Sequence, residues 1–328
     1  MSFRIIRNGL LDTIQDAGRY GYQHLGINPG GAMDRIAMHI ANALVGNKPE
    51  EAVVEMHFPA AEIVFEKNVL MALGGADFSA TINGEEIPTL QPVLIREGTV
   101  LRFTKKKTGA RVYLAIQGGF VADKWLNSYS THLNVKAGGF EGRALHKKDT
   151  LLFKKKPDYS IVHSEHLFET LPWKAKVSDL YCTNSFRFIP GKEYDLLDAR
   201  SKQKIMHQSF TISRESNRMG YRLQADALQL QSPKEMISTA ITLGTIQLLP
   251  DGQLIILMAD HQTTGGYPRL GHIISADIPS LAQLSAGENF FLQPADIQTA
   301  EALLAEQEMN LQQLQNACNF RLQEYFNI

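Results

Sequence analysis

Three polar, glycine-rich stretches hold the residues whose types could do chemistry. The first, "TIQDAGRYGYQHLGINPGGAMD" (residues 13–34), contains Gln15, Asp16, Arg19 and Asp34. It shows no apolar period, and glycine weakens helices and strands alike while letting a backbone bend sharply or approach a ligand closely. We therefore interpret this stretch as a site-forming loop, with a plain structured connector as the alternative.

The other two stretches lie in the second half of the chain. "SRESNRMGYRL" (residues 213–223) gathers Asn217, Arg218, Tyr221 and Arg222 around a glycine, although a surface arginine pair beside a turn would look the same. "MADHQTTGGYPRLG" (residues 258–271) follows the apolar run "QLIIL", which places its polar residues just beyond a strand end. These residues are Asp260, Gln262, Thr263, Thr264, Gly265, Gly266 and Tyr267. We expect all three stretches to converge on one cleft, with separate rims of the fold as the alternative.

The residue types favour binding and electrostatics around an amide-like substrate. Amides, hydroxyls and backbone N–H groups beside glycine form a neutral donor array that suits a carbonyl, ureido or carboxylate oxygen. Arginine binds a carboxylate through two N–H groups, and aspartate acts as a base or holds such a group in place. We assign substrate binding to Gln15, Asn217, Arg218, Tyr221, Arg222 and residues 262–267. Catalytic roles are assigned to Asp16, Arg19, Asp34 and Asp260.

Several familiar sites are absent from the sequence. It has no phosphate loop, no G-x-G-x-x-G, no H-E-x-x-H and no G-x-S-x-G. "HSEH" (residues 163–166) has no third ligand that the sequence marks, so we interpret it as surface histidines and predict no metal site. No Ser–His or Cys–His pairing is indicated, which disfavours covalent acyl transfer.

Composition limits the location and the partners. The 328 residues suffice for two domains, and a net charge of -1 offers no field for a nucleic acid or an anionic membrane. No run approaches the roughly 20 apolar residues of a membrane helix, and the first residues do not resemble a signal peptide. We therefore expect a cytoplasmic protein that binds neither nucleic acid nor membrane.

Short runs rich in Val, Ile and Phe predict a mainly β chain. Asn83-Gly84 predicts a tight hairpin turn, and residues 105–107 are expected to form another hairpin tip. Asp34 is expected to cap a helix that ends at Gly46, and Asp277 to cap a short helix "IPSLAQL".

Changes in composition suggest three regions. The basic, proline-containing "KKKPDYS" (residues 154–160) is the best candidate boundary. It separates an N-terminal β-rich lobe, residues 1–155, from a second β-barrel lobe, residues 160–293. Residues 294–328 carry leucines near helical spacing and predict a C-terminal tail of one or two amphipathic helices.

Six blocks together resemble one known family. They are "QDAGRYGYQHLGINPGGAMD", "ANALVGN", "YLAIQGG", "SNRMGYRL", "GTIQLLPDG" and "ADHQTTGGYP". In this order they are similar to the allophanate hydrolase subunit 2 family, which is related to biotin-dependent carboxyltransferase domains, over about residues 5–300. One departure is "NPGGAMD", where the family more often has serine before the glycine, so a hydroxyl donor is missing.

The resemblance implies a fold, partners and an activity. The expected fold is mainly β, with cyclophilin-like β-barrel lobes, a few helices and a helical C-terminal tail. The expected partners are a subunit of the allophanate hydrolase subunit 1 type and a LamB/YcsF-type subunit. Together they would form a bacterial ATP-dependent 5-oxoprolinase that opens 5-oxo-L-proline to L-glutamate, with this chain inactive alone.

Two alternatives follow from the same resemblance. One is a carboxyltransferase subunit of a biotin-dependent, urea carboxylase-type enzyme. The other is a KipA-like regulator that antagonises the inhibitor of a sensor kinase. The chain carries no biotinyl module and no ATP-grasp segment that we recognise, so it would run neither whole reaction by itself.

Overall fold

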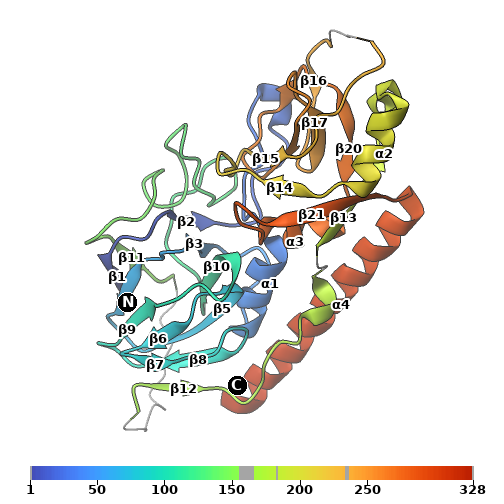
Figure 1. Ribbon diagram of the computed structural model, residues 1–328. Coiled ribbons are helices and arrows are strands. Elements are labelled where there is room, and N and C mark those ends of the chain that lie inside the picture. Colours follow the sequence, from blue (N-terminus) through green and yellow to red (C-terminus); the bar gives the residue numbers. More distant parts are fainter. Residues whose placement is uncertain (1, 155–165, 182–183, 233–235, 327–328) are drawn as a thin grey trace. The chain divides into compact units, whose positions relative to one another are not determined.

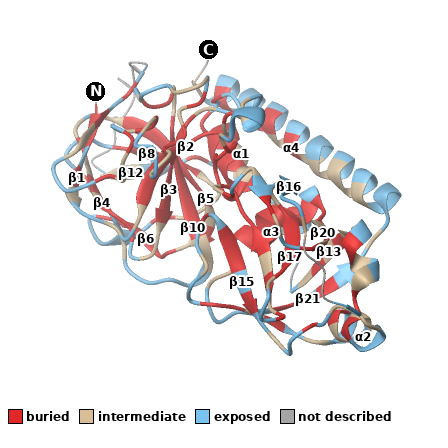
Figure 2. Cartoon of the chain, turned by 90° about the horizontal axis from the view of Figure 1, so that it is seen from above, coloured by how far each residue is buried: buried red, intermediate tan, exposed pale blue. Residues whose placement is uncertain are grey.

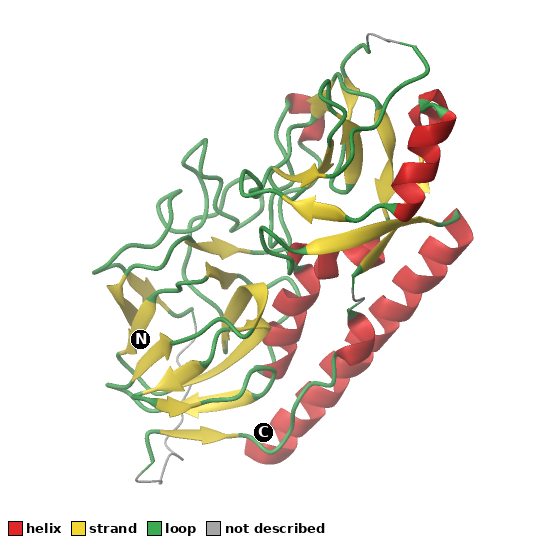
Figure 3. Ribbon diagram, in the orientation of Figure 1, coloured by secondary structure: helices red, strands yellow, loops and turns green. Residues whose placement is uncertain are grey.

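The computed structural model describes residues 2–154, 166–181, 184–232 and 236–326, and Figures 1 and 3 show a mainly β chain with few helices. This confirms the predicted fold class. The chain forms two compact units. The first comprises Met1–Arg19, Asp34–Ser178 and Met309–Ile328, and the second comprises Tyr20–Met33 and Asp179–Glu308. The opening glycine-rich stretch is thus divided between the units. Most of the predicted boundary segment, residues 155–160, and most of "HSEH" lie outside the described residues.

Two six-stranded sheets build the first unit. One has the order β11-β1-β4-β9-β6-β7 and the other β12-β8-β5-β10-β3-β2. Buried apolar side chains from both sheets form one cluster, and Figure 2 shows β3, β5 and the greater part of β10 in the colour of buried residues. The bounds are β1 Ser2–Arg7, β2 Asp12–Gln15, β3 Val53–His57, β4 Glu62–Phe65, β5 Val69–Asp77, β6 Ala80–Ile82, β7 Glu85–Glu86, β8 Pro92–Ile95, β9 Val100–Phe103, β10 Thr108–Ile116, β11 Thr150–Leu152 and β12 Phe168–Thr170.

Helix α1 (Arg35–Leu44) lies against the second of these sheets. Its predicted cap is confirmed, because the Asp34 carboxylate accepts a hydrogen bond from Ala37 N at 2.9 Å. Gly46 follows the helix with φ +71°, the left-handed conformation expected there. The helix approaches β5 so closely that a Cβ on Gly74 would lie 2.3 Å from Ala37 O. Only glycine therefore fits at this crossing.

The predicted turns have different outcomes. Asn83 and Gly84 join β6 to β7 with φ +49° and +98°, so the predicted hairpin is confirmed. The prediction for residues 105–107 was wrong, because β9 and β10 belong to different sheets. A charged segment between two apolar runs marks a change of chain direction both in a hairpin and in a connection between sheets. The sequence does not reveal whether the second strand pairs with the first.

The second unit is a closed barrel with the strand order β13-β20-β17-β18-β15-β14-β21. The parallel pairing of β13 with β21 closes the barrel. In its core the rings of Phe186 and Phe290 pack edge to face, with their centroids 5.2 Å apart. A separate two-stranded sheet pairs β16 with β19. The bounds are β13 Ser185–Pro190, α2 Ala199–His207, β14 Phe210–Ile212, β15 Gly220–Gln224, β16 Thr239–Ala240, β17 Thr245–Leu248, β18 Leu254–Leu257, β19 Thr264–Gly265, β20 Arg269–Ile273, α3 Ile278–Ala282 and β21 Asn289–Pro294.

The short helix α3 exists as predicted, but its predicted cap was wrong. Asp277 makes no side-chain capping bond. Its carboxylate instead accepts from Arg187 N at 2.7 Å and from the Arg187 guanidinium at 2.5 and 3.0 Å. An arginine 90 positions away competes better for this buried carboxylate than the helix N–H groups do, and this competition is not visible from local sequence.

A single helix, α4 (Ile297–Phe326), forms the predicted helical tail. Gln307 in the first half of α4 donates to Ala276 O at 3.1 Å within the second unit. Farther along, Gln315 donates to Asn47 O at 3.2 Å within the first unit. Among the described helices, none combines the length and the apolar character that crossing a bilayer requires. Likewise, no three His, Cys, Asp or Glu side chains gather as metal ligands within the described residues.

Candidate functional site

A cavity of about 480 Å³ lies on the outer face of the barrel in the second unit. Arg222 in β15 is paired with Ile255 in β18, which is paired in turn with Gln247 in β17. Residues directly opposite on neighbouring strands point to the same face, so these three side chains form one row. All three line the cavity. The neighbouring positions Tyr221 and Ile256 point the other way, into the barrel core.

Three loops form the walls of this cavity. They are the segment before β15, the turn after β17 and the loop after β18. The second and third sequence stretches therefore share one cavity. The lining residues are Glu215, Asn217, Met219, Gly220, Arg222, Gln247, Leu249, Pro250, Asp251, Ile255, Leu257, Gln262 and Tyr267.

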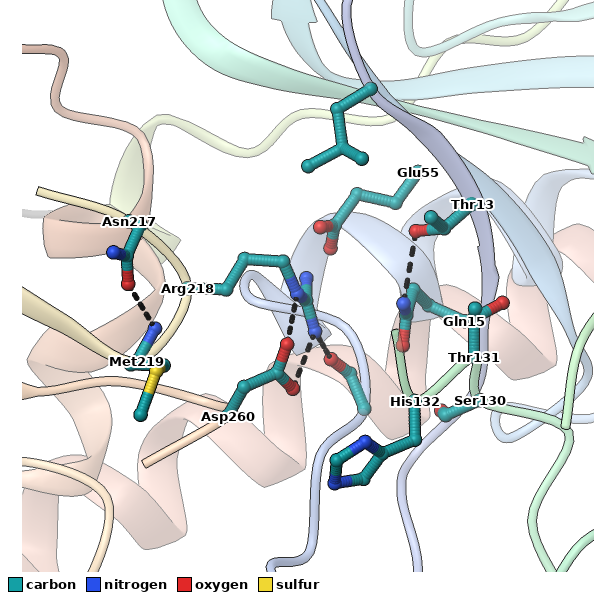
Figure 4. Close-up of polar contacts among 12 residues, drawn as sticks. Thr13, Gln15, Glu55, Ser130, Thr131, His132, Asn217, Arg218, Met219 and Asp260 are labelled. Carbon is teal, nitrogen blue, oxygen red and sulfur yellow. Dashed lines mark hydrogen bonds and ion pairs between the residues drawn. The ribbon is translucent and has the colours of Figure 1, made fainter. Parts of the chain in front are cut away.

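Three neutral amides, Asn217, Gln247 and Gln262, belong to the polar lining. Asn217 accepts from Met219 N at 2.8 Å through its side-chain oxygen, as Figure 4 shows, which leaves its NH₂ group for other partners. Gln262 is exposed. Gln247 is only 1% exposed, and its side-chain nitrogen has no hydrogen-bond partner among the described residues. Such groups suit a planar amide or ureido ligand, which offers both acceptors and donors.

The charged lining is one arginine and two carboxylates. Arg222 Nε lies 3.8 Å from the Glu215 carboxylate, and the two side chains are 49% and 77% exposed. An ion pair this exposed contributes at most about 1 kcal/mol, so Arg222 can exchange Glu215 for a ligand carboxylate. Asp251 accepts from Gln253 N at 2.9 Å in the turn after β17. The two carboxylates outnumber the arginine, so the cavity has a net negative formal charge.

Arg218 and Asp260 hold the opening stretch rather than the cavity. Arg218 Nε and Nη2 lie 2.7 and 3.2 Å from the Asp260 carboxylate, and Figure 4 shows the guanidinium aimed at it. Arg218 Nη2 also donates to Gly31 O at 2.6 Å, and Asn28 donates to Asp260 O at 2.9 Å. Because Arg218 is 6% exposed, this geometry assigns the pair to positioning residues 28–31.

The start of the opening stretch is a buried anchor in the first unit. The Asp16 carboxylate accepts from Ser128 Oγ, Ser130 Oγ and Tyr129 N, each at 2.6 Å, and from Gly18 N at 2.8 Å. Asp16 is 6% exposed. These donors occupy the oxygens that a general base would need, so this placement favours the structured connector for Asp16.

Arg19 and Gln15 are also buried in the first unit, each 1% exposed. Arg19 donates to Ser130 O and lies with its guanidinium carbon 4.9 Å from the centre of the Trp125 ring. Gln15 donates to Thr13 Oγ1 at 2.9 Å, as Figure 4 shows. Its side-chain oxygen has no partner among the described residues. Of the opening residues, Gln15 thus keeps a group that a ligand could use.

Two further predicted site residues have structural positions. Asp34 is fully buried as the cap of α1, and its backbone N–H donates to the Tyr113 hydroxyl at 2.8 Å. Tyr221 is 2% exposed in the barrel core, where its hydroxyl lies 3.4 Å from Ala282 O. The two-residue period of β15 explains the latter, because Tyr221 and Arg222 must point to opposite faces.

The remaining predicted residues lie along the loop after β18. The backbone carbonyl of Thr263 accepts from Ile241 N at 3.1 Å, and Thr264 and Gly265 form β19. Gly266 and Tyr267 line a second cavity of about 690 Å³, which shares Leu249, Pro250 and Tyr267 with the first, whereas Gly266 is not among the described residues that line the first. The lining of that second cavity is mostly apolar: Leu228, Leu230, Met236, Leu248, Leu249, Pro250 and Pro268.

A buried histidine precedes Gln262. His261 is 1% exposed, and burial lowers its pKa below the ordinary value. Its Nδ1 lies 2.5 Å from Gln262 O, which can only accept, so Nδ1 carries the proton. His272 also has a lowered pKa, through burial and through the nearby His261. Neither ring lines the cavity.

Sequence reasoning missed three polar residues of the cavity: Gln247, Glu215 and Asp251. Gln247 carried a usable signal, since it is a single amide inside the apolar run "TIQLL". Strand period 2 places it on the face opposite Ile246 and Leu248, which are core residues. No such signal existed for Glu215 and Asp251, because charged residues in turns are common.

The chemistry available to the cavity is binding, orientation and proton transfer. No Ser, Cys, His or Lys is among its described lining residues. Arg222 suits a carboxylate, the amides suit a planar carbonyl and N–H pair, and Tyr267 gives an aromatic wall. The cavity therefore fits a small, neutral or singly anionic amide.

Comparisons with known proteins show the family of the chain. A family model described as carboxyltransferase domain, subdomain A and B, matches residues 25–294. The chain is 34% identical over 302 residues to the C component of 5-oxoprolinase from Haemophilus influenzae, across 92% of this chain and 94% of that protein. It is 35% identical over 312 residues to the Escherichia coli protein of the same name, across 95% and 97%.

A solved structure shows the same fold inside a larger enzyme. Urea carboxylase from Kluyveromyces lactis matches with a TM-score of 0.84 and 25% identity over 95% of this chain. The chain spans 29% of that protein. Because the family model covers most of the chain and both 5-oxoprolinase relatives align along nearly all of it, this chain belongs to the carboxyltransferase domain family with subdomains A and B.

Proposed function

We propose that the chain is the C component of a bacterial ATP-dependent 5-oxoprolinase, which opens 5-oxo-L-proline to L-glutamate. The observation that carries this proposal is the barrel cavity, which combines one exposed arginine with neutral amides. The substrate is a five-membered lactam that bears one carboxylate, so it needs both kinds of group. The two relatives at 34% and 35% identity, both named as this component of 5-oxoprolinase, support the same assignment.

Within the cavity, Arg222 binds the substrate carboxylate in this proposal. Asn217, Gln262 and Tyr267 surround the lactam ring. The predicted catalytic residues have structural roles in this proposal. They hold loop segments and the start of α1 in place; these residues are Asp16, Arg19, Asp34 and Asp260.

ATP is consumed by the assembled enzyme, and we place its binding on a partner subunit. The cavity carries Glu215 and Asp251 against a single Arg222. A polyphosphate would meet two like charges there and one compensating cation, so the described lining does not fit it.

The expected partners are a subunit of the allophanate hydrolase subunit 1 type and a LamB/YcsF-type subunit. Because the chain has no phosphate loop and its cavity offers no nucleophile among the described lining residues, it is inactive alone. Glutamate release from 5-oxo-L-proline is the test, measured with the purified chain, with each pair of subunits and with all three. Turnover by the chain alone, or no turnover by a folded mixture of the three, overturns the proposal.

A second candidate is carboxyl transfer from carboxybiotin to an amide substrate such as urea. The fold shared with a urea carboxylase at 25% identity favours it. Asn217, Gln247 and Gln262 would hold a ureido group, since they offer neutral donors and acceptors. Carboxybiotin would supply the carboxyl group itself. Transfer of labelled carboxyl from a biotinylated carrier to urea, without glutamate formation from 5-oxo-L-proline, would select this alternative.

A further inference from the structure

Gln247 is a buried polar side chain that faces a cavity without using its donor. It is 1% exposed, and its Nε2 has no partner among the described residues. A buried amide left without a partner costs roughly 1 to 3 kcal/mol. The structure therefore retains an unfavourable group in the row that ends at Arg222.

The strand around Gln247 is irregular at this position. Between β17 and β20, Ile246 pairs with Gly271 but Gln247 pairs with Arg269, so the register shifts between the two. Such shifts redirect side chains and occur often beside binding sites. Here the shift coincides with the one amide in an otherwise apolar run.

Gly265 fixes where the Gln247 amide lies. A Cβ built on Gly265 would come within 2.6 Å of Gln247 Nε2 and 2.9 Å of Ile241 Cδ1. Gly265 is itself buried and pairs with Thr239 in the small sheet, which limits how far its backbone can move away. The next residue, Gly266, has more room, because its nearest neighbours would be 3.3 and 3.5 Å away.

We propose that Gln247 recognises the carbonyl oxygen of a planar lactam or ureido ligand, and that Gly265 keeps its amide in the binding orientation. The inference rests on the proposed function for the choice of ligand. A site with a buried donor rejects analogues that lack the acceptor, since binding them leaves the donor unsatisfied. Gln247 thus determines specificity for the amide, whereas Arg222 recognises the carboxylate.

Three small probes separate these two contributions. 5-Oxo-L-proline carries both groups, 2-pyrrolidinone carries only the lactam, and cyclopentanecarboxylate carries only the carboxylate. Their dissociation constants are measured by ligand-observed NMR with the chain alone and with the complete assembly of three subunits. The variants are Gln247→Met, which keeps length and removes the donor, and Gln247→Glu, which keeps shape and replaces the donor with an acceptor.

Both Gln247 variants are expected to raise the dissociation constants of 5-oxo-L-proline and 2-pyrrolidinone by roughly 10-fold or more, because each variant loses one buried hydrogen bond to the ligand. The affinity of Gln247→Met for cyclopentanecarboxylate should not fall, and Gln247→Glu, which adds a negative charge, is judged on the uncharged 2-pyrrolidinone. Equal affinities of wild type and variants for both lactams overturn the inference. So does a wild type that binds none of the three probes, alone and in the assembly.

Gly265→Ala provides an independent test and Gly266→Ala its matched control. We expect Gly265→Ala to lower the affinity for both lactams, whereas Gly266→Ala should leave both affinities unchanged. Thermal unfolding is recorded for each variant. Equal lactam affinities for the two folded variants contradict the role of Gly265.

The outcomes also separate this inference from the proposed function. If lactam binding depends on Gln247 but the complete assembly releases no glutamate, the proposed function fails and the inference stands. If the assembly is active and Gln247→Met changes neither lactam affinity nor KM, the inference fails and the proposed function stands.

Discussion

Arg218 Nε lies 2.7 Å from the Asp260 carboxylate, and each of these two residues also holds the backbone or side chain of residues 28–31. Arg218 donates a hydrogen bond to Gly31 O, and the backbone carbonyl of Asp260 accepts one from the Asn28 side chain. One ion pair therefore ties three segments that are far apart in the chain. Its role is to fix residues 28–31 of the opening glycine-rich stretch within the second unit.

Arg218→Ala should lower the free energy of unfolding by about 3 kcal/mol or more, because it leaves a largely buried carboxylate without its cation. The double variant Arg218→Ala/Asp260→Ala should cost less than the sum of the two single variants. Arg222→Ala, 49% exposed on the neighbouring strand β15, is the control and should change stability by about 0.5 kcal/mol or less. Urea denaturation measures all of these variants. An Arg218→Ala variant as stable as Arg222→Ala contradicts the account.

Arg19→Ala is expected to destabilise the first unit by about 2 kcal/mol. The substitution removes a donor to Ser130 O and a guanidinium over Trp125 from a site that is 1% exposed. Arg7→Ala, whose side chain is 74% exposed, serves as the control. If Arg19→Ala instead abolishes activity of the assembled enzyme without changing the unfolding midpoint, Arg19 is a site residue as the sequence first suggested.

Asp12 should make stability depend on pH. Burial raises the pKa of its carboxyl from 3.8 to about 7, against opposing hydrogen bonds such as that from Ala61 N at 3.0 Å. A folded-state pKa above the unfolded one means that the folded chain binds the proton more tightly. The resulting stabilisation is full below about pH 4 and is lost as pH rises through about 7.

Asp12→Asn mimics the protonated carboxyl and should flatten that dependence. The difference in unfolding free energy between variant and wild type should change by about 2 kcal/mol between about pH 5 and about pH 8, in favour of the variant at high pH. Urea denaturation at both pH values measures it. A difference that stays constant shows that Asp12 does not titrate in this range.

Cys318 should resist thiol reagents until the chain unfolds. It is 3% exposed in α4, and burial raises the pKa of its thiol to about 11. In a Cys182→Ser background, alkylation near pH 8 should be slow in buffer and at least roughly 100-fold faster in denaturant, because the thiolate is both scarce and inaccessible. Comparable rates in the two conditions would mean that this part of α4 opens readily.

Local signals predicted local structure well. The Asn83-Gly84 turn depends on φ angles that few other residues adopt, and Asp34 caps α1 through a donor three residues away. Asp277 shows the limit, because its partner Arg187 lies 90 positions away. Residues 105–107 show a second limit of local prediction, because pairing with distant strands determines whether such a segment forms a hairpin or connects two sheets.

The site was predictable to a similar extent. Polar residues in "SNRMGYRL" and in the loop after β18 pointed to one cavity, and Asn217, Arg222, Gln262 and Tyr267 line it. Composition could not separate ligand groups from anchors. Asp16 and Arg218 have the residue types of a catalytic site, yet Asp16 accepts hydrogen bonds from Ser128, Tyr129 and Ser130 of its own unit, and Arg218 binds Gly31 and Asp260 of its own unit. That distinction depends on burial, which a single sequence does not specify.

Replacing the exposed polar groups of the cavity tests the central claim most directly. The measurement is ATP-dependent glutamate formation from 5-oxo-L-proline by the complete assembly of three subunits, which contains either wild type or the double variant Arg222→Ala/Gln262→Ala. Both side chains are exposed, so the variant should fold and assemble normally. We predict a loss of kcat/KM of roughly 100-fold or more, since a charged and a neutral contact to the substrate are removed. An intact assembly whose kcat/KM is unchanged would contradict the assignment of substrate binding to this cavity.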